Sequence, residues 1–110
     1  MDLNVVRENA SRACALLKSL ANEDRLLLLC QLVDGEKTVS ELERLTGIRQ
    51  PTLSQQLGVL RNENLVSTRR EGKWIYYSIG NPQVMTMLET LHGLFCRETF
   101  GEMDLNESRS

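Results

Sequence analysis

The sequence is poor in the residues on which most enzyme and metal chemistry depends. It has one histidine and three cysteines in 110 residues, and no two cysteines form a CxxC pair. A single histidine does not allow a Ser/His/Asp or Cys/His/Asn set to be assigned, and there is no glycine-rich phosphate loop. These absences argue against an enzyme, including a small thiol-dependent one, and we predict no cofactor.

Long apolar segments are also missing. The longest apolar run is LLLLC, residues 26–30, which is far too short to cross a bilayer, and the N-terminus lacks a basic-then-apolar signal. We therefore expect a cytoplasmic protein with no membrane association. Cysteines spaced this widely are not expected to form structural disulfides in a reducing compartment, so a functional cysteine would act in switching or ligation.

The chain has no large net charge, but its charges are unevenly distributed. The formal net charge is −2 and the pI is about 5.4, which taken alone argues against nucleic-acid binding. Residues 44–73, however, include six basic and only two acidic residues, so this window carries +4. Attraction to phosphates depends on the local charge more than on the total, and acidic flanks would restrain non-specific binding.

Length and composition indicate one globular domain. Hydrophobic residues make up 41% of the chain and charged residues 25%, which are ordinary values for a folded protein. A chain of this size has a large surface for its volume, so a core shared within a dimer would add stability. We expect a folded domain over residues 1–98 and a flexible polar tail over residues 99–110.

Apolar spacing predicts three helices outside the centre of the chain. Stripes at intervals of three and four residues predict a first helix over about residues 4–20 and a last helix over about residues 82–98. A second helix is predicted over residues 22–34, with Cys30 on its inward face. Terminal helices that carry apolar stripes suit pairing with a second copy, so we expect a homodimer formed through the first and last helices.

The centre of the chain predicts a short helix, a turn, another short helix and a hairpin. Ser40 and Glu43 have the spacing of a capping box that opens a helix ending near Gly47. The next helix covers residues 51–62, with its proline in the first turn, where a missing N–H is tolerated. Residues 65–79 are rich in β-branched and aromatic residues around a Glu-Gly pair, which indicates a two-stranded β-hairpin with a basic tip.

The outer face of the helix at 51–62 is polar, mostly uncharged and rich in amides and hydroxyls. A merely solvated helix would more often carry Glu and Lys there. A helix-turn-helix followed by a hairpin makes a winged helix-turn-helix, so we predict a mainly α fold of five helices and two strands. Its second helix fits the major groove, where Gln can bond to adenine and Ser or Thr to several base edges. The predicted base-reading residues are Gln50, Thr52, Ser54, Gln55 and Gln56, the last of which leans toward the core.

Basic residues flank this helix and the hairpin tip. They are expected to hold phosphates or line the minor groove, and so to position the protein rather than to specify sequence. They are Arg49, Arg61, Arg69, Arg70 and Lys73. Two short helices and a hairpin can also be mere packing elements, but the amide-rich face, the local charge and the hairpin occur together. Double-stranded operator DNA is therefore the predicted partner.

The segment SELERLTGIRQPTLSQQLGVLRNENLVSTRREGKWIYYSI, with the order of elements around it, closely resembles the ArsR/SmtB family of winged helix repressors. The resemblance extends over about residues 10–98. It implies homodimers built through the first and last helices, operators that are imperfect palindromes, and release of DNA when an inducer arrives.

Three motifs, LLLLCQLVDGE, GIRQPTLSQQLGVLR and LHGLFCRE, look like the thiol- and persulfide-sensing branch of that family, which has HlyU-like relatives. In that branch one cysteine in the second helix and one in the last helix form a switch. By resemblance these are Cys30 and Cys96, whereas Cys14 is outside the pattern. The implied function is a repressor that releases its operator when reactive sulfur species or oxidants join the two cysteines.

Two alternatives stay open. A metal-responsive repressor would use Cys30, His92 and Cys96 in some arrangement, and Glu89 can share a helical face with the last two. That set is incomplete, because zinc takes four ligands or three with a water, and the third helix has neither Cys nor His. The second alternative is a derepressor, as among HlyU-like relatives, which acts by displacing a silencer.

Overall fold

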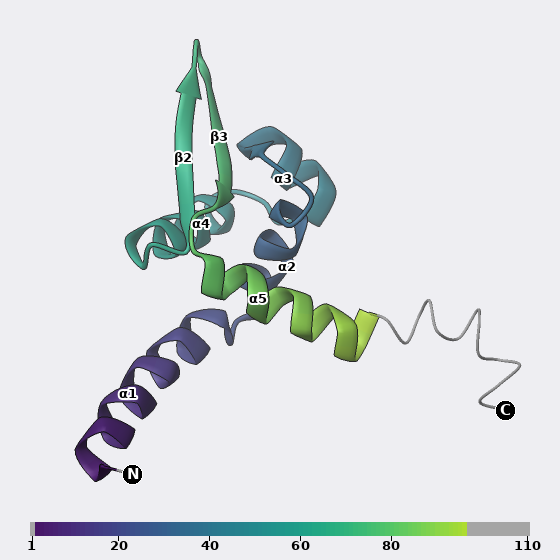
Figure 1. Cartoon of the computed structure of the whole chain (residues 1–110). Helices are drawn as coiled ribbons and strands as arrows, with labels where there is room; N and C mark the ends of the chain where they lie inside the picture. The colour runs from purple at the N-terminus through teal and green to yellow at the C-terminus, as the bar shows by residue number, and fades with distance from the viewer. Residues whose placement is uncertain (1, 97–110) are drawn as a thin grey trace, which may run out of the picture.

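The computed structural model describes residues 2–96, with only the backbone of Cys96. The five predicted helices are present in this range, and a π-helical turn continues the last of them (Figure 1). They are α1 (Leu3–Leu20), α2 (Glu23–Leu32), α3 (Val39–Thr46), α4 (Thr52–Asn62), α5 (Pro82–Leu91) and the turn η1 (His92–Cys96). The predicted tail over residues 99–110, and the predicted last two residues of the final helix, lie outside the described residues.

Within residues 2–96 the sheet has three strands, one more than predicted. Strands β2 (Val66–Glu71) and β3 (Trp74–Ile79) form the predicted hairpin, which stands out from the helices as the wing in Figure 1. A short strand β1 (Lys37–Thr38) pairs with the other side of β3, so that the antiparallel order is β1-β3-β2. Two residues are too few to show the alternation by which a strand is recognised in a sequence.

The third helix begins earlier than predicted. Its capping box is made by Thr38 and Glu41, and the prediction of Ser40 and Glu43 was wrong. The backbone N–H of Glu41 donates to Thr38 Oγ1 at 3.2 Å, and that of Thr38 donates to Glu41 Oε1 at 2.8 Å. The second of these bonds is the main cause that holds the pKa of Glu41 below its usual value. Both pairs have the same spacing, so spacing alone does not distinguish them.

A Thr38→Ala variant is expected to lose about 1 kcal/mol of unfolding free energy, because the substitution removes the side-chain acceptor of the cap. Ser40→Ala is the matched control, since Ser40 is exposed and lies inside α3. Its loss should stay within about 0.5 kcal/mol. Urea unfolding of both variants measures the difference, and equal losses would show that Thr38 is not the cap.

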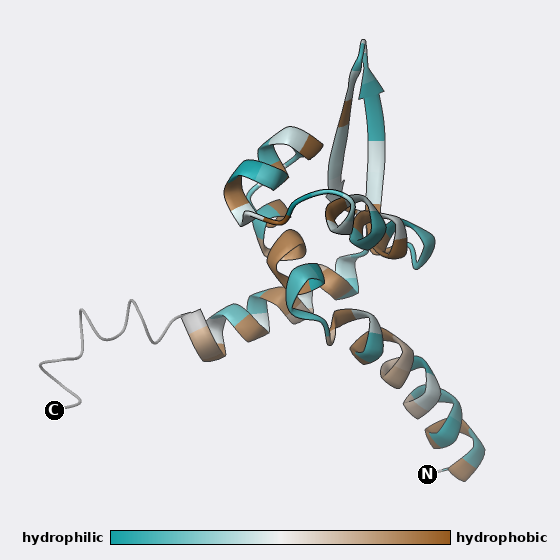
Figure 2. Ribbon diagram, turned by 180° about the vertical axis from the view of Figure 1, so that it is seen from behind, coloured by the Kyte–Doolittle hydropathy of each residue, from teal (hydrophilic) through white to brown (hydrophobic). Residues whose placement is uncertain are grey.

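The core is built where α2 meets the other helices, and in Figure 2 the apolar residues are concentrated at this centre. On α2 the buried residues are Leu28, Leu29 and Leu32. The predicted inward position of Cys30 was wrong, since its side chain is exposed. A run of four leucines does not indicate which side of the helix faces the core, so the packing of the neighbouring helices decides which of them are buried.

Helix α1 projects from the body of the molecule (Figure 1). Only Ser19 and Leu20 at its C-terminal end are buried, whereas Leu17 is 51% exposed. At the other end of the described chain Phe95 in η1 is 68% exposed. Much of the apolar surface predicted for the first and last helices is therefore uncovered within one chain. None of the described helices has the length and apolar character needed to span a membrane.

Candidate nucleic-acid interface

Helices α3 and α4 are joined by a turn that is fixed at both ends. Gly47 ends α3 with φ of 77°, a left-handed conformation that favours glycine. Ile48 is buried in the core, and its backbone N–H donates to Thr46 Oγ1 at 3.1 Å. The turn thereby fixes the direction in which α4 follows α3, as a helix-turn-helix requires, and both helices pack on α2.

Helix α4 has one face in the core and one in solvent. Leu53, Leu57 and Leu60 are buried, and their spacing of four and three residues places them on one face of the helix. Ser54 and Gln55 are exposed on the other side, and Thr52 is half-buried at the start of the helix. Buried leucines fix the rotation of the helix about its own axis, so the hydroxyl and amide groups are presented outward on a rigid support.

Two of the predicted base-reading glutamines have partners within the chain. Gln50 Oε1 accepts a hydrogen bond from the backbone N–H of Ser54 at 3.1 Å, at a helix start where Pro51 offers no side-chain cap. Gln50 therefore keeps its amide NH₂ for another contact. Gln56 is half-buried, as predicted, and its Oε1 accepts a hydrogen bond from Arg25 Nη1 at 3.0 Å. Sequence reasoning missed Arg25, because nothing local marks a partner 31 residues away.

The predicted phosphate-binding residues differ in their surroundings. Arg49, Arg61 and Arg70 are exposed and form no ion pair within residues 2–96. Lys73 Nζ lies 5.2 Å from the centroid of the Trp74 ring at the wing tip. A cation over a ring face at an exposed site is held only weakly, so this ammonium group stays accessible to a phosphate.

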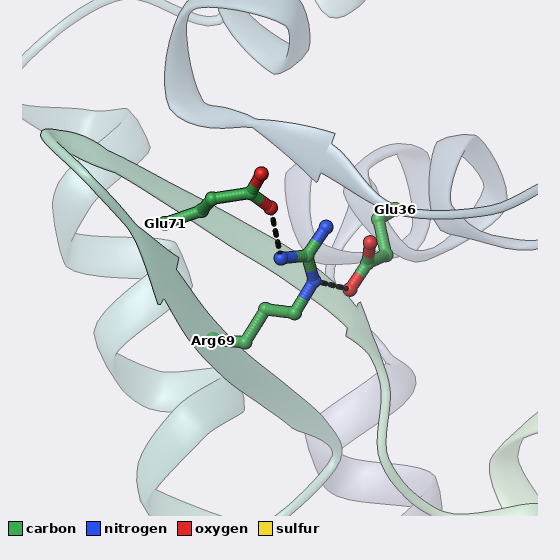
Figure 3. A network of polar contacts seen from close by, with 3 residues as sticks. All are labelled: Glu36, Arg69 and Glu71. Atoms are coloured by element: carbon green, nitrogen blue, oxygen red, sulfur yellow. Dashed lines mark hydrogen bonds and ion pairs between the residues drawn. The ribbon is translucent and has the colours of Figure 1, made fainter.

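Arg69 is held in the polar network drawn in Figure 3. Its Nε donates to Glu36 Oε2 at 2.7 Å, and its Nη1 donates to Glu71 Oε1 at 2.6 Å. Its guanidinium carbon also lies 4.5 Å from the centroid of the Tyr76 ring. The hydrogen bond from Arg69 lowers the pKa of Glu36, and the two carboxylates raise the pKa of Arg69. Two anionic partners offset this cation, so Arg70 is the wing arginine better placed to attract a phosphate.

A cavity of about 440 Å³ lies between α2 and α5. It is lined by Cys30, Gln31, Val33, Asp34, Leu88, Glu89 and His92. Cys14 lies on α1 and is not part of this lining. The predicted partner of Cys30, Cys96, ends η1 four residues after His92, and its side chain lies outside the described part. Among the described residues no three His, Cys, Asp or Glu side chains are grouped to hold a metal ion.

Comparison with known proteins identifies the fold family. The sequence model described as "Bacterial regulatory protein, arsR family" matches residues 22–68. The Biofilm growth-associated repressor of Agrobacterium fabrum is 47% identical over 94 residues, which cover 86% of this chain and 80% of the relative. The chain belongs to the ArsR family. It is therefore a DNA-binding transcriptional regulator and not an enzyme.

Two further relatives of this ArsR-family chain confirm the predicted winged helix-turn-helix. The transcriptional activator HlyU of Vibrio cholerae is 41% identical over 97 residues, which cover 88% of this chain and 90% of HlyU. The structure of reduced HlyU matches with a TM-score of 0.82 over 86% of this chain and 99% of that chain. A homodimeric winged helix-turn-helix DNA-binding domain from Mycobacterium bovis is 29% identical, with a TM-score of 0.71 over 92% of this chain and 93% of that chain.

Proposed function

We propose that this regulator is a homodimeric repressor that binds an imperfect palindrome through α4 and the wing. The observation that carries this proposal is the exposed amide and hydroxyl face of α4, which three buried leucines hold in a fixed orientation. Exposed arginines without a carboxylate partner in the described part of the chain flank that face. The repressor from Agrobacterium fabrum and the homodimeric DNA-binding domain from Mycobacterium bovis support the same function.

The interface separates base reading from phosphate binding. Thr52, Ser54 and Gln55 on α4, with the NH₂ group of Gln50, are proposed to meet base edges in the major groove. The proposed phosphate contacts are Arg49, Arg61, Arg70 and Lys73, with a weaker contribution from Arg69 because of its two carboxylate partners.

Gln55→Ala is expected to weaken binding to a cognate duplex relative to a random one by roughly 1–3 kcal/mol, because a base-edge contact is lost. Arg70→Ala should weaken both complexes similarly and reduce the slope of log affinity against log salt concentration by about 1. The cognate duplex is obtained by selection from a random pool with the unmodified protein. Fluorescence anisotropy at several salt concentrations measures both effects.

Gln83→Ala provides the matched control, since it removes an exposed amide from α5 and should change neither affinity. If Gln55→Ala lowered affinity for cognate and random duplexes equally, the assignment of base reading to the outer face of α4 would be wrong.

The proposed inducer is a reactive sulfur species, such as a persulfide, or another oxidant that joins Cys30 to Cys96. Three facts support it. Cys30 is exposed and lines the cavity between α2 and α5, where a small reagent can reach it. His92 lines the same cavity and begins the turn that ends at Cys96. The HlyU relative has been solved in a form described as reduced.

One relative favours activation of transcription as a second possible effect of DNA binding. HlyU of Vibrio cholerae is described as a transcriptional activator, so the same DNA-binding event can raise expression where it displaces a silencer. Expression of a reporter gene behind the selected operator separates the two outputs: a repressor lowers expression in a strain without other regulators of that promoter, and a derepressor leaves it unchanged.

A further inference from the structure

A single side chain from α2 joins the C-terminal end of α1 to α4. Arg25 Nε donates to the carbonyl oxygen of Ser19 at 2.6 Å, and its Nη2 donates to that of Lys18 at 3.2 Å. On its other side Nη1 donates to Gln56 Oε1 at 3.0 Å. The guanidinium group therefore contacts two helices that are far apart along the chain.

This contact is stiff for three reasons. The two carbonyl groups belong to the last turn of α1, where backbone oxygens have no partner inside the helix and where a cation opposes the negative end of the helix dipole. The backbone of Arg25 is fixed as well, since its N–H donates to the capping side chain of Asn22 at 3.0 Å. The guanidinium donors form a planar fork, so a shift of α4 against α1 breaks at least one hydrogen bond.

A second contact links the same two helices. The Ser19 hydroxyl can donate to Glu63 Oε1 at 3.2 Å, in competition with the carbonyl oxygen of Ala15 within α1 at 3.1 Å, and Glu63 is the C-cap residue of α4. Helix α4 is thus tied to the end of α1 at Gln56, near its middle, and at Glu63, at its end. These polar contacts fix how far α4 can rotate relative to α1.

We propose that Arg25 is a positioning residue that sets the spacing of the two half-sites that the dimer reads. The inference rests on the proposed function, in which α4 enters the major groove, and on the predicted dimer interface, which includes α1. With α1 held against the partner subunit, any rotation of α4 changes its distance from the partner's recognition helix. Half-sites lie about one helical turn apart, so a looser α4 tolerates a wider range of spacings. Gln56 then serves as the acceptor for Arg25 and does not read bases.

The experiment measures how strongly the protein discriminates between spacings. The probes are the duplex selected by the unmodified protein and the same duplex with one base pair inserted or removed between the half-sites. The ratio of the two affinities is the spacing discrimination. Arg25→Met and Gln56→Met are each expected to lower it about three- to tenfold, and the double variant is expected to lower it no further, because contacting residues are coupled. Methionine keeps an unbranched side chain and removes the donors or the acceptor.

Two variants serve as controls. Arg61→Met removes one positive charge from α4, as Arg25→Met removes one from α2, but it leaves the contact with α1 in place. It should therefore weaken binding to every duplex and leave the spacing discrimination unchanged. Gln56→Glu keeps an acceptor for Arg25 and should keep the discrimination near that of the unmodified protein, even where its negative charge lowers overall affinity. Urea unfolding establishes that each variant is folded, and if Arg25→Met is not, the two Gln56 variants carry the test.

An unchanged spacing discrimination in folded Gln56→Met protein would overturn the positioning role. An equal loss in Gln56→Glu and Gln56→Met would overturn it too, and would assign Gln56 to the reading of bases. Failure of the proposed function has a separate signature, because the unmodified protein would then select no duplex with two half-sites.

Discussion

A Cys30→Ser variant is expected to bind operator DNA like the unmodified protein and to stay bound when a persulfide is added. The unmodified protein should lose about 5–150-fold in affinity under the same treatment, the range typical of coupling between two sites. Serine matches cysteine closely in size but cannot form a sulfur–sulfur bond. Cys96→Ser should behave in the same way, because the bond needs both thiols.

The proposed reaction balances with the persulfide as the oxidant. One cysteine thiolate attacks the outer sulfur of RSSH, so that RSH leaves and the cysteine becomes a persulfide. The second thiolate attacks the cysteine sulfur of that persulfide, a disulfide forms, and the outer sulfur leaves as H₂S. Two thiols and one RSSH thus give one disulfide, one RSH and one H₂S. The protein loses two hydrogen atoms, a change that intact-mass spectrometry detects.

The position of Cys30 explains why such a bond would affect DNA binding. Helix α2 carries both Cys30 and Arg25, and Arg25 contacts the recognition helix through Gln56. A bond to the end of η1 would join α2 to the last helix, which is proposed to help build the dimer. The spacing of the two recognition helices would change as a result.

Cys14→Ser is the matched control for this prediction. Cys14 is exposed on α1, and the cavity that Cys30 lines does not include it. This variant should release DNA with the dose dependence of the unmodified protein. Anisotropy titrations without oxygen, with a small organic persulfide as the reagent, compare the three variants. Release of DNA by Cys30→Ser at unchanged doses would rule out the dithiol switch.

Local signals in the sequence were sufficient for most of the fold. Asn22 and Asn81 cap α2 and α5, and Gly47 ends α3 in a left-handed conformation, near the predicted end of that helix. The three buried leucines of α4 recur at intervals of four and three residues, a spacing that is visible in the sequence. Each of these features depends on residues within about one helical turn of one another, which is why sequence patterns report them.

Features that depend on distant contacts could not be predicted. The phase of α2 is set by neighbouring helices, so Cys30 was placed on the wrong face. The bond between Arg25 and Gln56 and the ion pair between Arg69 and Glu36 join residues 31 and 33 positions apart. Both contacts change the interpretation of the candidate site, because each involves a side chain that was predicted from the sequence to contact DNA.

Disrupting the dimer interface is also expected to have a large effect on DNA binding, because one chain leaves apolar side chains exposed. Helix α1 projects from the body with Leu3, Val5 and Leu17 exposed, and η1 exposes Leu94 and Phe95. Apolar side chains on two projecting elements favour association with a second copy. A two-fold dimer then presents two recognition helices, and the second half-site is bound at a high effective concentration.

Leu17→Glu is expected to give a monomer and to lower affinity for the two-half-site duplex by about 10²–10⁴-fold, because a charge cannot enter an apolar interface without a partner and the second contact is then lost. Affinity for a duplex with one half-site should hardly change, since α4 is untouched. Leu27→Glu is the matched control: it places the same charge at an exposed leucine of α2 and should leave the dimer intact. Sedimentation and anisotropy measure the two quantities, and a Leu17→Glu protein that still sediments as a dimer would exclude this part of α1 from the interface.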